Sequence, residues 1–296
     1  MSNPRSITNR HGQTVATVHP PTGPAVPVVV SVPHAGESIP DDIDALLAHS
    51  DHDLRHEMLQ DVDRFVDRFW PDAPSQGAWL IVAHHSRYVV DLNRAPDDTS
   101  AEVVQGAVAK DQPGYYGERG VIWARTTRRT PVWQAPMSQE AFERRIGDYH
   151  VPYHQALEAL LTETCARFGR VLLIDGHSMP SQGRAGHGDT GQRRPDINPG
   201  TVDDTSTDHR FADIVDGHLR EQGLEVKRNA PYKGGWITRH YGRPQHGWHA
   251  IQIEVNRHLY MDEVTCAPKE EGIARVRAAM AGIIPAITAA MGTEAP

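Results

Sequence analysis

The sequence predicts one α/β domain with a mixed, mainly parallel sheet flanked by helices. Two observations predict this class. Short apolar runs rich in valine, isoleucine and leucine, typical of buried strands, alternate along the chain with segments of helical periodicity. Neither an internal repeat nor a linker divides the 296 residues, which are enough for one large domain. We expect that domain to span residues 28–296, preceded by a loose N-terminal arm at 1–27 that contains a short strand near 14–18.

Four elements are expected in the first half of the domain. A run of β-branched residues predicts a strand at 28–32. A one-sided apolar stripe predicts an amphipathic helix at 54–70, which Pro71 ends, and Asp63 lies at the edge of that stripe. The other two predicted elements are strands at 79–83 and 86–92.

A long helical region dominates the second half. It is predicted at 138–168, with Ser138 suited to the N-cap, Pro152 to a kink and Gly169 to the position after the last turn. Residues 180–208 are rich in glycine, aspartate and arginine and predict a long loop. The remaining predicted elements are strands at 171–174, 224–227 and 250–256, a helix at 211–222, and a helix within 262–291.

Composition argues against several kinds of partner. The formal net charge is -8, and lysines and arginines are scattered, which argues against a nucleic acid or an anionic membrane. No apolar run approaches the roughly 20 residues needed to span a bilayer, and residues 1–13 lack the apolar core of a signal peptide. Two cysteines, Cys165 and Cys266, suit a reducing compartment. We therefore expect a cytoplasmic protein that acts on a small molecule.

Polar side chains cluster where the predicted strands end. His34 and Glu37 follow the first strand with His-x-x-Glu spacing, and His177 follows the strand at 171–174. Open α/β sheets place their ligands at the carboxyl ends of their strands. Two histidines and one carboxylate, with one position left open, are the ligands of a hydrolytic zinc site, and another divalent metal is possible.

Two further features point to a substrate. In the last predicted strand, alternation places Glu254 opposite the apolar Ile251 and Ile253, so Glu254 is our candidate general base. Asn93 and Arg94 follow another predicted strand. The guanidinium fork matches a carboxylate, so this pair suits an acidic substrate.

Ordered motifs over most of the chain carry a resemblance. The chain resembles the N-formylglutamate amidohydrolase (N-formylglutamate deformylase) family, which is similar to zinc carboxypeptidases and aspartoacylases. The matching motifs are Val32-Pro33-His34-Ala35-Gly36, Asp61-Val62-Asp63-Arg64, Ser86-Arg87-Tyr88-Val89-Val90-Asp91-Leu92-Asn93-Arg94, Pro152-Tyr153-His154, Asp175-Gly176-His177-Ser178, Pro195-Asp196-Ile197-Asn198, Gly234-Gly235-Trp236-Ile237-Thr238-Arg239 and His249-Ala250-Ile251-Gln252-Ile253-Glu254.

The resemblance implies a fold, an activity and a pathway. The expected fold is a zinc-carboxypeptidase-like sheet with the metal at its strand ends. The expected reaction is metal-dependent hydrolysis of N-formyl-L-glutamate to formate and L-glutamate, within histidine degradation. The expected partner is therefore a small N-acyl amino acid.

Several residues gain candidate roles. Arg87 is a candidate to polarise the scissile carbonyl or hold the substrate, with a structural ion pair as the alternative. The family motif implies a substrate contact for Asn198. The turn at Gly235 allows the backbone to approach a ligand, and Arg239 is a candidate for the distal carboxylate, with a solvated loop charge as the alternative.

The third metal ligand stays open between two carboxylates. Local spacing favours Glu37, because it completes His-x-x-Glu with His34. The family resemblance favours Asp63. We therefore keep both as alternatives.

Two other functions remain as alternatives. The same metal site would serve a hydrolase of another N-acyl amino acid or a small peptide. A non-catalytic ligand-binding protein with a decayed site is the third reading, and the intact His34, His177 and Glu254 argue against it.

Overall fold

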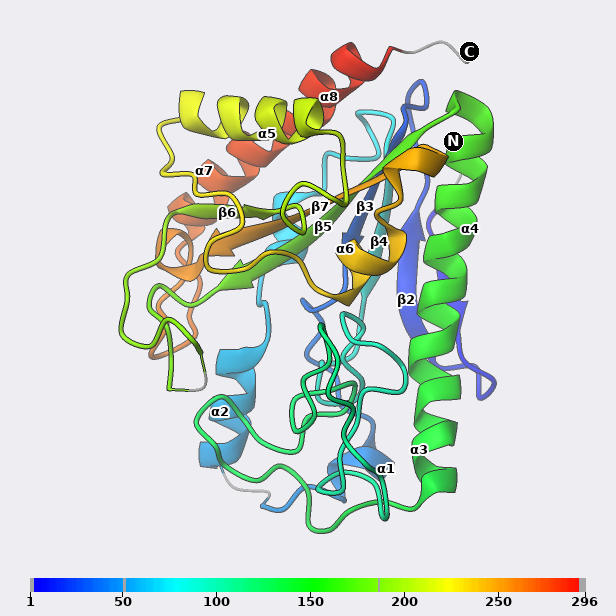
Figure 1. The fold of residues 1–296 in the computed structure, drawn as a ribbon, viewed down its shortest axis with the longest axis vertical. Coiled ribbons are helices and arrows are strands. Elements are labelled where there is room, and N and C mark those ends of the chain that lie inside the picture. The colour runs from blue at the N-terminus through cyan, green and yellow to red at the C-terminus, as the bar shows by residue number, and fades with distance from the viewer. Residues whose placement is uncertain (1–2, 50–51, 186, 293–296) are drawn as a thin grey trace.

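The computed structural model describes residues 3–49, 52–185 and 187–292. Seven described strands form one sheet in the order β1-β2-β4-β3-β5-β7-β6 (Figure 1). The strands are β1 (Arg5–Thr8), β2 (Thr14–His19), β3 (Val28–Val32), β4 (Trp79–Ala83), β5 (Val171–Met179), β6 (Ile197–Gly200) and β7 (Trp248–Asn256). The α-helices are α1 (Asp41–Asp44), α2 (His52–Asp61), α3 (Gln139–Arg145), α4 (Val151–Phe168), α5 (His209–Glu221), α6 (Trp236–Tyr241), α7 (Glu270–Ala281) and α8 (Ile283–Met291). Shorter turns are 3₁₀ at Val66–Phe69, Pro244–His246 and Arg257–Leu259, and π-helical at Ile146–His150.

The sheet is parallel in its centre and antiparallel at both edges. β4, β3, β5 and β7 pair in parallel, whereas β1 with β2, β2 with β4, and β6 with β7 pair antiparallel. The predicted α/β class with a mixed sheet is therefore confirmed. Because the four central strands run in one direction, their carboxyl ends meet at one edge.

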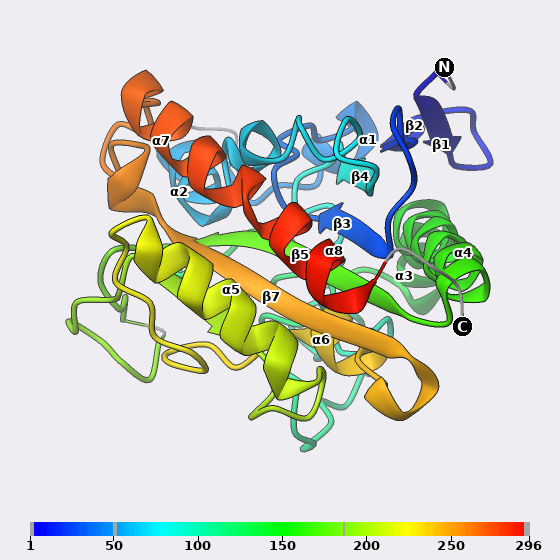
Figure 2. The same cartoon turned by 90° about the horizontal axis from the view of Figure 1, so that it is seen from above.

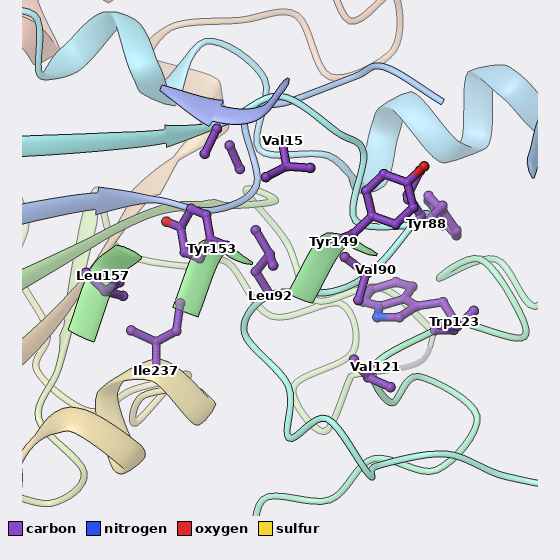
Figure 3. Close-up of a cluster of buried hydrophobic side chains, with 14 of the residues drawn as sticks. Val15, Tyr88, Val90, Leu92, Val121, Trp123, Tyr149, Tyr153, Leu157 and Ile237 are labelled. Atoms are coloured by element: carbon purple, nitrogen blue, oxygen red, sulfur yellow. The ribbon is translucent and has the colours of Figure 1, made fainter. Parts of the chain in front are cut away.

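Side-chain alternation builds a core on each face of the sheet. Along β3, Val28 and Val30 enter one cluster and Val29 enters the other. Figure 2 shows α5, α7 and α8 over one face, with α4 on the other side of the sheet. Figure 3 shows the cluster on the α4 side, where Tyr153 and Leu157 of α4 and Ile237 of α6 gather with buried loop residues.

The expected arm at 1–27 is not loose, because it contains two strands of the sheet; the short strand expected near 14–18 is confirmed as β2, whereas β1 was not expected. β2 pairs antiparallel with β4, and Ala16 lies opposite Ala83. Val15, Ala16 and Val18 are buried in the core. Few apolar residues stand in this segment, so the sequence indicated a short strand but not that it joins the edge of the main sheet.

The predicted helix at 54–70 is also wrong in its second half. The structure ends α2 at Asp61, and Phe65 has a left-handed φ of 67°. The backbone N–H of Asp63 donates to the carbonyl of His34 over 3.0 Å. This long-range bond replaces a helical one and turns Asp63 toward the end of β3.

Two predicted strands are not strands in the structure. Residues 86–92 form turns, in which the Val89 N–H donates to the Ser86 carbonyl and the Asp91 N–H donates to the Val121 carbonyl. Their apolar side chains are nevertheless buried, in the core cluster that also contains Val121, Ile122 and Trp123. The predicted strand at 224–227 is reduced to one bridge, Ile197 to Val226. The predicted loop at 180–208 contains β6.

The predicted long helix is confirmed with an irregularity. The Ser138 side chain caps α3 by accepting from the Ala141 N–H, and Gly169 ends α4 with a φ of 71°. Pro152 lies in the first turn of α4, directly after the π-helical turn. The proline therefore divides the helix as its missing N–H requires.

By length and composition, Glu270–Met291 could cross a membrane, and 39% of its most apolar window is buried. It consists of α7 and α8, separated at Gly282. Apolar side chains from both helices lie in the core over the sheet, namely Ile273, Val276, Ala279, Met280, Ile283, Ile284, Ile287 and Met291. We interpret this stretch as core helices, and the absence of a membrane partner stays a prediction.

Candidate active site

Three buried side chains converge where β3 and β5 approach their carboxyl ends. His34 follows β3, His177 lies in β5, and Asp63 follows α2. The Asp63 Oδ2 atom lies 3.4 Å from His34 Nδ1 and 3.0 Å from His177 Nδ1. One donor atom from each residue lies within 4.8 Å of the others. The structure therefore brings Asp63 to both histidines.

A polar partner fixes the far side of each of these groups. His34 Nε2 lies 2.7 Å from Asp91 Oδ1, and His177 Nε2 lies 2.9 Å from Asp175 Oδ2. Asp63 Oδ1 accepts hydrogen bonds from Arg257 Nη2 at 2.9 Å and from the Ser178 hydroxyl at 3.2 Å. Such outer partners orient ligands toward a metal and set the histidine tautomer.

Electrostatics keeps Asp63 ionised. Burial raises the pKa of Asp63, but the hydrogen bond from His177 and the nearby charges of both histidines outweigh burial and hold that pKa well below its usual range. Burial lowers the pKa of His177, yet the charge and hydrogen bond of Asp175 bring it well above its usual range. A buried cluster with this much charge is typical of a functional site.

The donor set fits a divalent metal ion. The buried Nδ1 of His34 has no hydrogen-bond partner among the described residues. Two imidazole nitrogens and one carboxylate oxygen are the protein ligands of catalytic zinc sites. A metal held there would satisfy the orphaned nitrogen.

Glu37 does not reach this cluster. Its carboxylate accepts a hydrogen bond from Arg64 Nε at 2.6 Å, and its side chain is 38% exposed. The His-x-x-Glu spacing thus places Glu37 in a surface ion pair in this structure. Of the two predicted third ligands, the geometry favours Asp63.

Glu254 lies beside the cluster on β7. Its Cα is the register partner of His177. Gln252 Nε2 donates to Glu254 Oε1 at 2.8 Å, whereas Oε2 is buried and has no hydrogen-bond partner in the described chain. Burial raises the pKa of Glu254 to about 7, although the charge of His177 opposes this. A carboxylate with one unused oxygen can exchange a proton with a substrate or water.

These residues line one cavity of about 170 Å³. Five of its lining residues are arginines: Arg87, Arg94, Arg119, Arg184 and Arg257. The same cavity contains Asn93, Gly235, Tyr232, Gln252 and Glu254. The cavity thus has two charged parts: the carboxylates beside the histidines, which we call its floor, and the five arginines, which belong to its walls. A cavity with cationic walls suits an anionic ligand.

Arg87 is fixed by an aspartate and a tryptophan. Its Nε and Nη2 donate to Asp91 Oδ2 at 3.1 and 2.6 Å, and its guanidinium carbon lies 4.3 Å from the Trp123 ring centre. Asp91 in turn contacts His34. The predicted alternative of a structural ion pair describes this geometry.

Asn93 and Gly235 pack closely against each other in the wall of the cavity. Asn93 Nδ2 lies 3.2 Å from His177 Nε2 and 3.3 Å from Gln252 Oε1, while Asn93 Oδ1 accepts the Ile237 N–H. A Cβ atom on Gly235 would lie 2.2 Å from Asn93 Nδ2. The glycine therefore permits the close approach on which this wall depends.

Two predicted substrate contacts lie outside the cavity lining. The Asn198 amide donates to the Pro199, Lys227 and Tyr232 carbonyls and accepts the Tyr232 N–H, so it shapes a neighbouring turn. Arg239 is exposed on α6. Neither side chain lines the cavity as the structure describes it.

Several residues that complete the site were not predicted from the sequence. They are Asp91, Ser178, Gln252, Arg257 and Arg119. Gln252 carries a signal, since it shares the polar face of its strand with Glu254. Arg257 carries another, since it directly follows that strand. Asp91 and Ser178 stand inside quoted motifs without a chemical reason in the local sequence.

The fold and the site together define the class: a one-sheet α/β protein with a buried His–Asp–His group beside a glutamate. The profile of the N-formylglutamate amidohydrolase family matches residues 26–261. The chain is 34% identical over 242 residues to the N-formylglutamate deformylase of Pseudomonas aeruginosa, covering 80% of this chain and 83% of that relative. It is 32% identical over 255 residues to the N-formylglutamate deformylase of Pseudomonas putida, covering 84% and 87%.

A solved structure agrees with these matches. The crystal structure of N-formylglutamate amidohydrolase from Ralstonia eutropha JMP134 superposes with a TM-score of 0.83 at 28% identity, over 94% of this chain and 98% of that one. This chain belongs to the N-formylglutamate amidohydrolase family.

Proposed function

We propose that this protein is a zinc-dependent amidohydrolase that cleaves N-formyl-L-glutamate into formate and L-glutamate. Family membership supports the substrate. The observation that carries the chemistry is the unpartnered Oε2 of Glu254 beside the His34–Asp63–His177 group. The cationic walls of the cavity suit the two carboxylates of this substrate.

His34, Asp63 and His177 would hold the zinc ion, with Asp91, Asp175 and Arg257 orienting them. Bound zinc would polarise the formyl carbonyl and lower the pKa of the attacking water. The convergence of donors and the orphaned His34 nitrogen support this assignment over one that uses Glu37.

Glu254 would move the proton. Its free oxygen takes a proton from the attacking water as the new C–O bond forms at the formyl carbon. The same carboxyl group then gives that proton to the amide nitrogen as the C–N bond breaks, so formate and the amine of glutamate leave. The hydrogen bond from Gln252 fixes the other oxygen and aims Oε2.

Arg94 would bind a substrate carboxylate from the wall. It lines the cavity next to Asn93, whose amide contacts His177. Arg87 would act through Asp91 as a positioning residue, because its fork already donates to that aspartate. Gly235 would keep the wall close to the substrate by accommodating Asn93.

Formate release from N-formyl-L-glutamate tests the proposal directly. The purified protein is assayed as prepared, after chelation and after zinc is returned. We expect release that chelation abolishes and zinc restores. No release from a zinc-loaded protein would refute the substrate, and release that survives complete metal removal would refute the metal dependence.

A short acyl series separates the alternatives. N-acetyl-L-glutamate and N-formyl-L-methionine replace the acyl group and the side chain in turn. Faster turnover of either would favour the hydrolase of another N-acyl amino acid. Absence of both turnover and bound metal would favour the ligand-binding protein. Cytoplasmic location and a place in histidine degradation stay predictions.

A further inference from the structure

Among the described residues, Arg87, Arg184 and Arg257 of the cavity each form an ion pair with an aspartate. The pairs are Arg87 with Asp91, Arg184 with Asp61, and Arg257 with Asp63, each with an N–O distance of 2.9 Å or less. These cations hold the acidic floor of the site together. The substrate's carboxylates therefore need other partners.

Arg94 is held in place by neutral groups. Its Nε donates to the Arg119 carbonyl at 3.0 Å, and its Nη1 donates to the Asn93 carbonyl at 2.8 Å. Its guanidinium carbon lies 4.0 Å from the Tyr116 ring centre. Within the described chain, no carboxylate forms an ion pair with Arg94. Its positive charge thus remains directed at the cavity.

Arg119 lies on the same wall and is partly buried. Its loop is tightly fixed, because the Asp98 carboxylate accepts the N–H groups of Tyr116 and Gly117. A Cβ atom on Gly120 would lie 2.1 Å from the Asp98 carbonyl oxygen, so the loop also needs a glycine there. Burial, followed by the charge of Arg94, lowers the pKa of Arg119. Arg94 and Arg119 are both cationic and line the same cavity, so an anion bound between them would relieve their repulsion.

We propose that Arg119 determines specificity by binding the side-chain carboxylate of the N-formyl amino acid, while Arg94 binds the α-carboxylate. This inference rests on the proposed function. The inference extends that function by assigning each substrate carboxylate to one arginine. It also gives the reason why N-formyl amino acids with an acidic side chain would be preferred.

The order of the two arginines follows from their contacts. The α-carboxylate is bonded to the carbon that carries the formamide nitrogen, whereas the side-chain carboxylate lies two methylenes farther away. Arg94 adjoins Asn93, which contacts His177 in the metal-binding cluster. Arg119 is one contact farther from the cluster, because its backbone carbonyl accepts from Arg94 Nε. We therefore assign the α-carboxylate to Arg94, which adjoins Asn93, and the side-chain carboxylate to Arg119.

Three substrates test this assignment with the zinc-loaded protein. They are N-formyl-L-glutamate, N-formyl-L-glutamine, which lacks the side-chain charge, and N-formyl-L-isoglutamine, which lacks the α-charge. In Arg119→Gln, the glutamate-to-glutamine ratio of kcat/KM should fall by about 10- to 100-fold, the range for a charge-assisted hydrogen bond. The glutamate-to-isoglutamine ratio should stay unchanged within error. Arg94→Gln should show the reverse pattern.

The loss in Arg119→Gln should fall mainly on KM, because a remote carboxylate is bound equally in the ground and transition states. Arg119→Lys should recover part of the ratio, since it keeps the charge but loses the planar fork. If Arg119 had a purely structural role, its replacement would lower kcat/KM for all three substrates by the same factor. Inhibition by the product L-glutamate, compared with L-glutamine, gives a second readout with the same expected pattern.

Arg125→Gln is the matched control. Arg125 stands on the same loop, pairs with Glu102 at 2.9 Å and lies outside the cavity lining. An equal loss of preference in this control, or an unchanged glutamate-to-glutamine ratio in Arg119→Gln, overturns the inference. A wild-type enzyme that releases formate equally fast from both substrates overturns it while the proposed function stands. Failure to release formate from any of the three refutes both.

Discussion

Replacing Gly235 by alanine tests whether the wall of the cavity depends on close packing. The backbone φ of Gly235 is -84°, a value that alanine adopts readily. The added methyl group would nevertheless lie 2.2 Å from Asn93 Nδ2 and 2.5 Å from Asn93 Oδ1. Asn93 must therefore move, and the perturbation is purely steric.

The cost follows from the hydrogen bonds that Asn93 makes. Because His177 Nε2 donates to Asp175 Oδ2, two clear hydrogen bonds remain: Asn93 Nδ2 donates to Gln252 Oε1 at 3.3 Å, and Asn93 Oδ1 accepts the Ile237 N–H at 2.8 Å. At about 0.5–1.5 kcal/mol each, the two bonds represent about 1–3 kcal/mol of folding free energy. Taking about 2 kcal/mol, and roughly 2–4 °C per kcal/mol for a chain of this size, Tm should fall by about 4–8 °C.

Thermal unfolding of the zinc-loaded protein and formate-release kinetics measure the effect. We expect kcat/KM to fall as well, because displacement of Asn93 disturbs Arg94 and His177. Gly217→Ala is the control, since Gly217 lies in α5 and its added methyl group meets nothing within 4 Å. That change should raise stability by about 0.5–1 kcal/mol. Wild-type Tm and kinetics in Gly235→Ala would refute the reasoning.

Three other predictions concern the site itself. Glu254→Gln should lower kcat by about 10²- to 10⁴-fold, the range for a general base, with zinc content unchanged by mass spectrometry; near-normal turnover would exclude the role. Asp63→Asn should lose zinc while Glu37→Gln keeps it, and the opposite pattern would restore Glu37 as the ligand. Arg257→Met should cost about 3–5 kcal/mol, because it leaves the buried Asp63 carboxylate without its cation. Arg277→Met, which breaks an exposed pair with Asp72, should change Tm far less, and equal shifts would contradict the argument.

Much of the central sheet could be predicted because its signals are local. Runs of β-branched and aliphatic residues specify β3, β4, β5 and β7, and each run is long enough to be recognised without knowing its neighbours. The edges of the sheet could not be predicted in the same way. β1 lies in a polar segment, β2 has only a short apolar signal, and β6 has only four residues inside a long loop. Their place in the sheet depends on pairing with strands that are distant in sequence, such as β4 and β7.

The residues of the candidate site also differ in whether a local sequence signal could predict them. His34, His177 and Glu254 could be named from sequence, because each lies on or directly after its own strand and the parallel centre brings strand ends together. Asn198 and Arg239 were plausible for their residue types, yet their side chains lie outside the cavity lining. A motif reports that residues occur together, but it does not report which way each side chain points.

The sequence by itself determined the α/β class, the central strands and the two histidines with Glu254, because periodicity and strand ends are local properties of the chain. Only the tertiary structure distinguishes Asp63, which it places beside both histidines, from Glu37, which it places in a surface ion pair. That difference depends on the Asp63 N–H bonding to the His34 carbonyl, on Arg257 reaching Asp63, and on Arg64 holding Glu37. The Asp63–Arg257 and Glu37–Arg64 contacts join residues 194 and 27 positions apart in sequence. Spacing along a chain cannot reveal such pairings, because they exist only once the packed core has set the distances between distant segments.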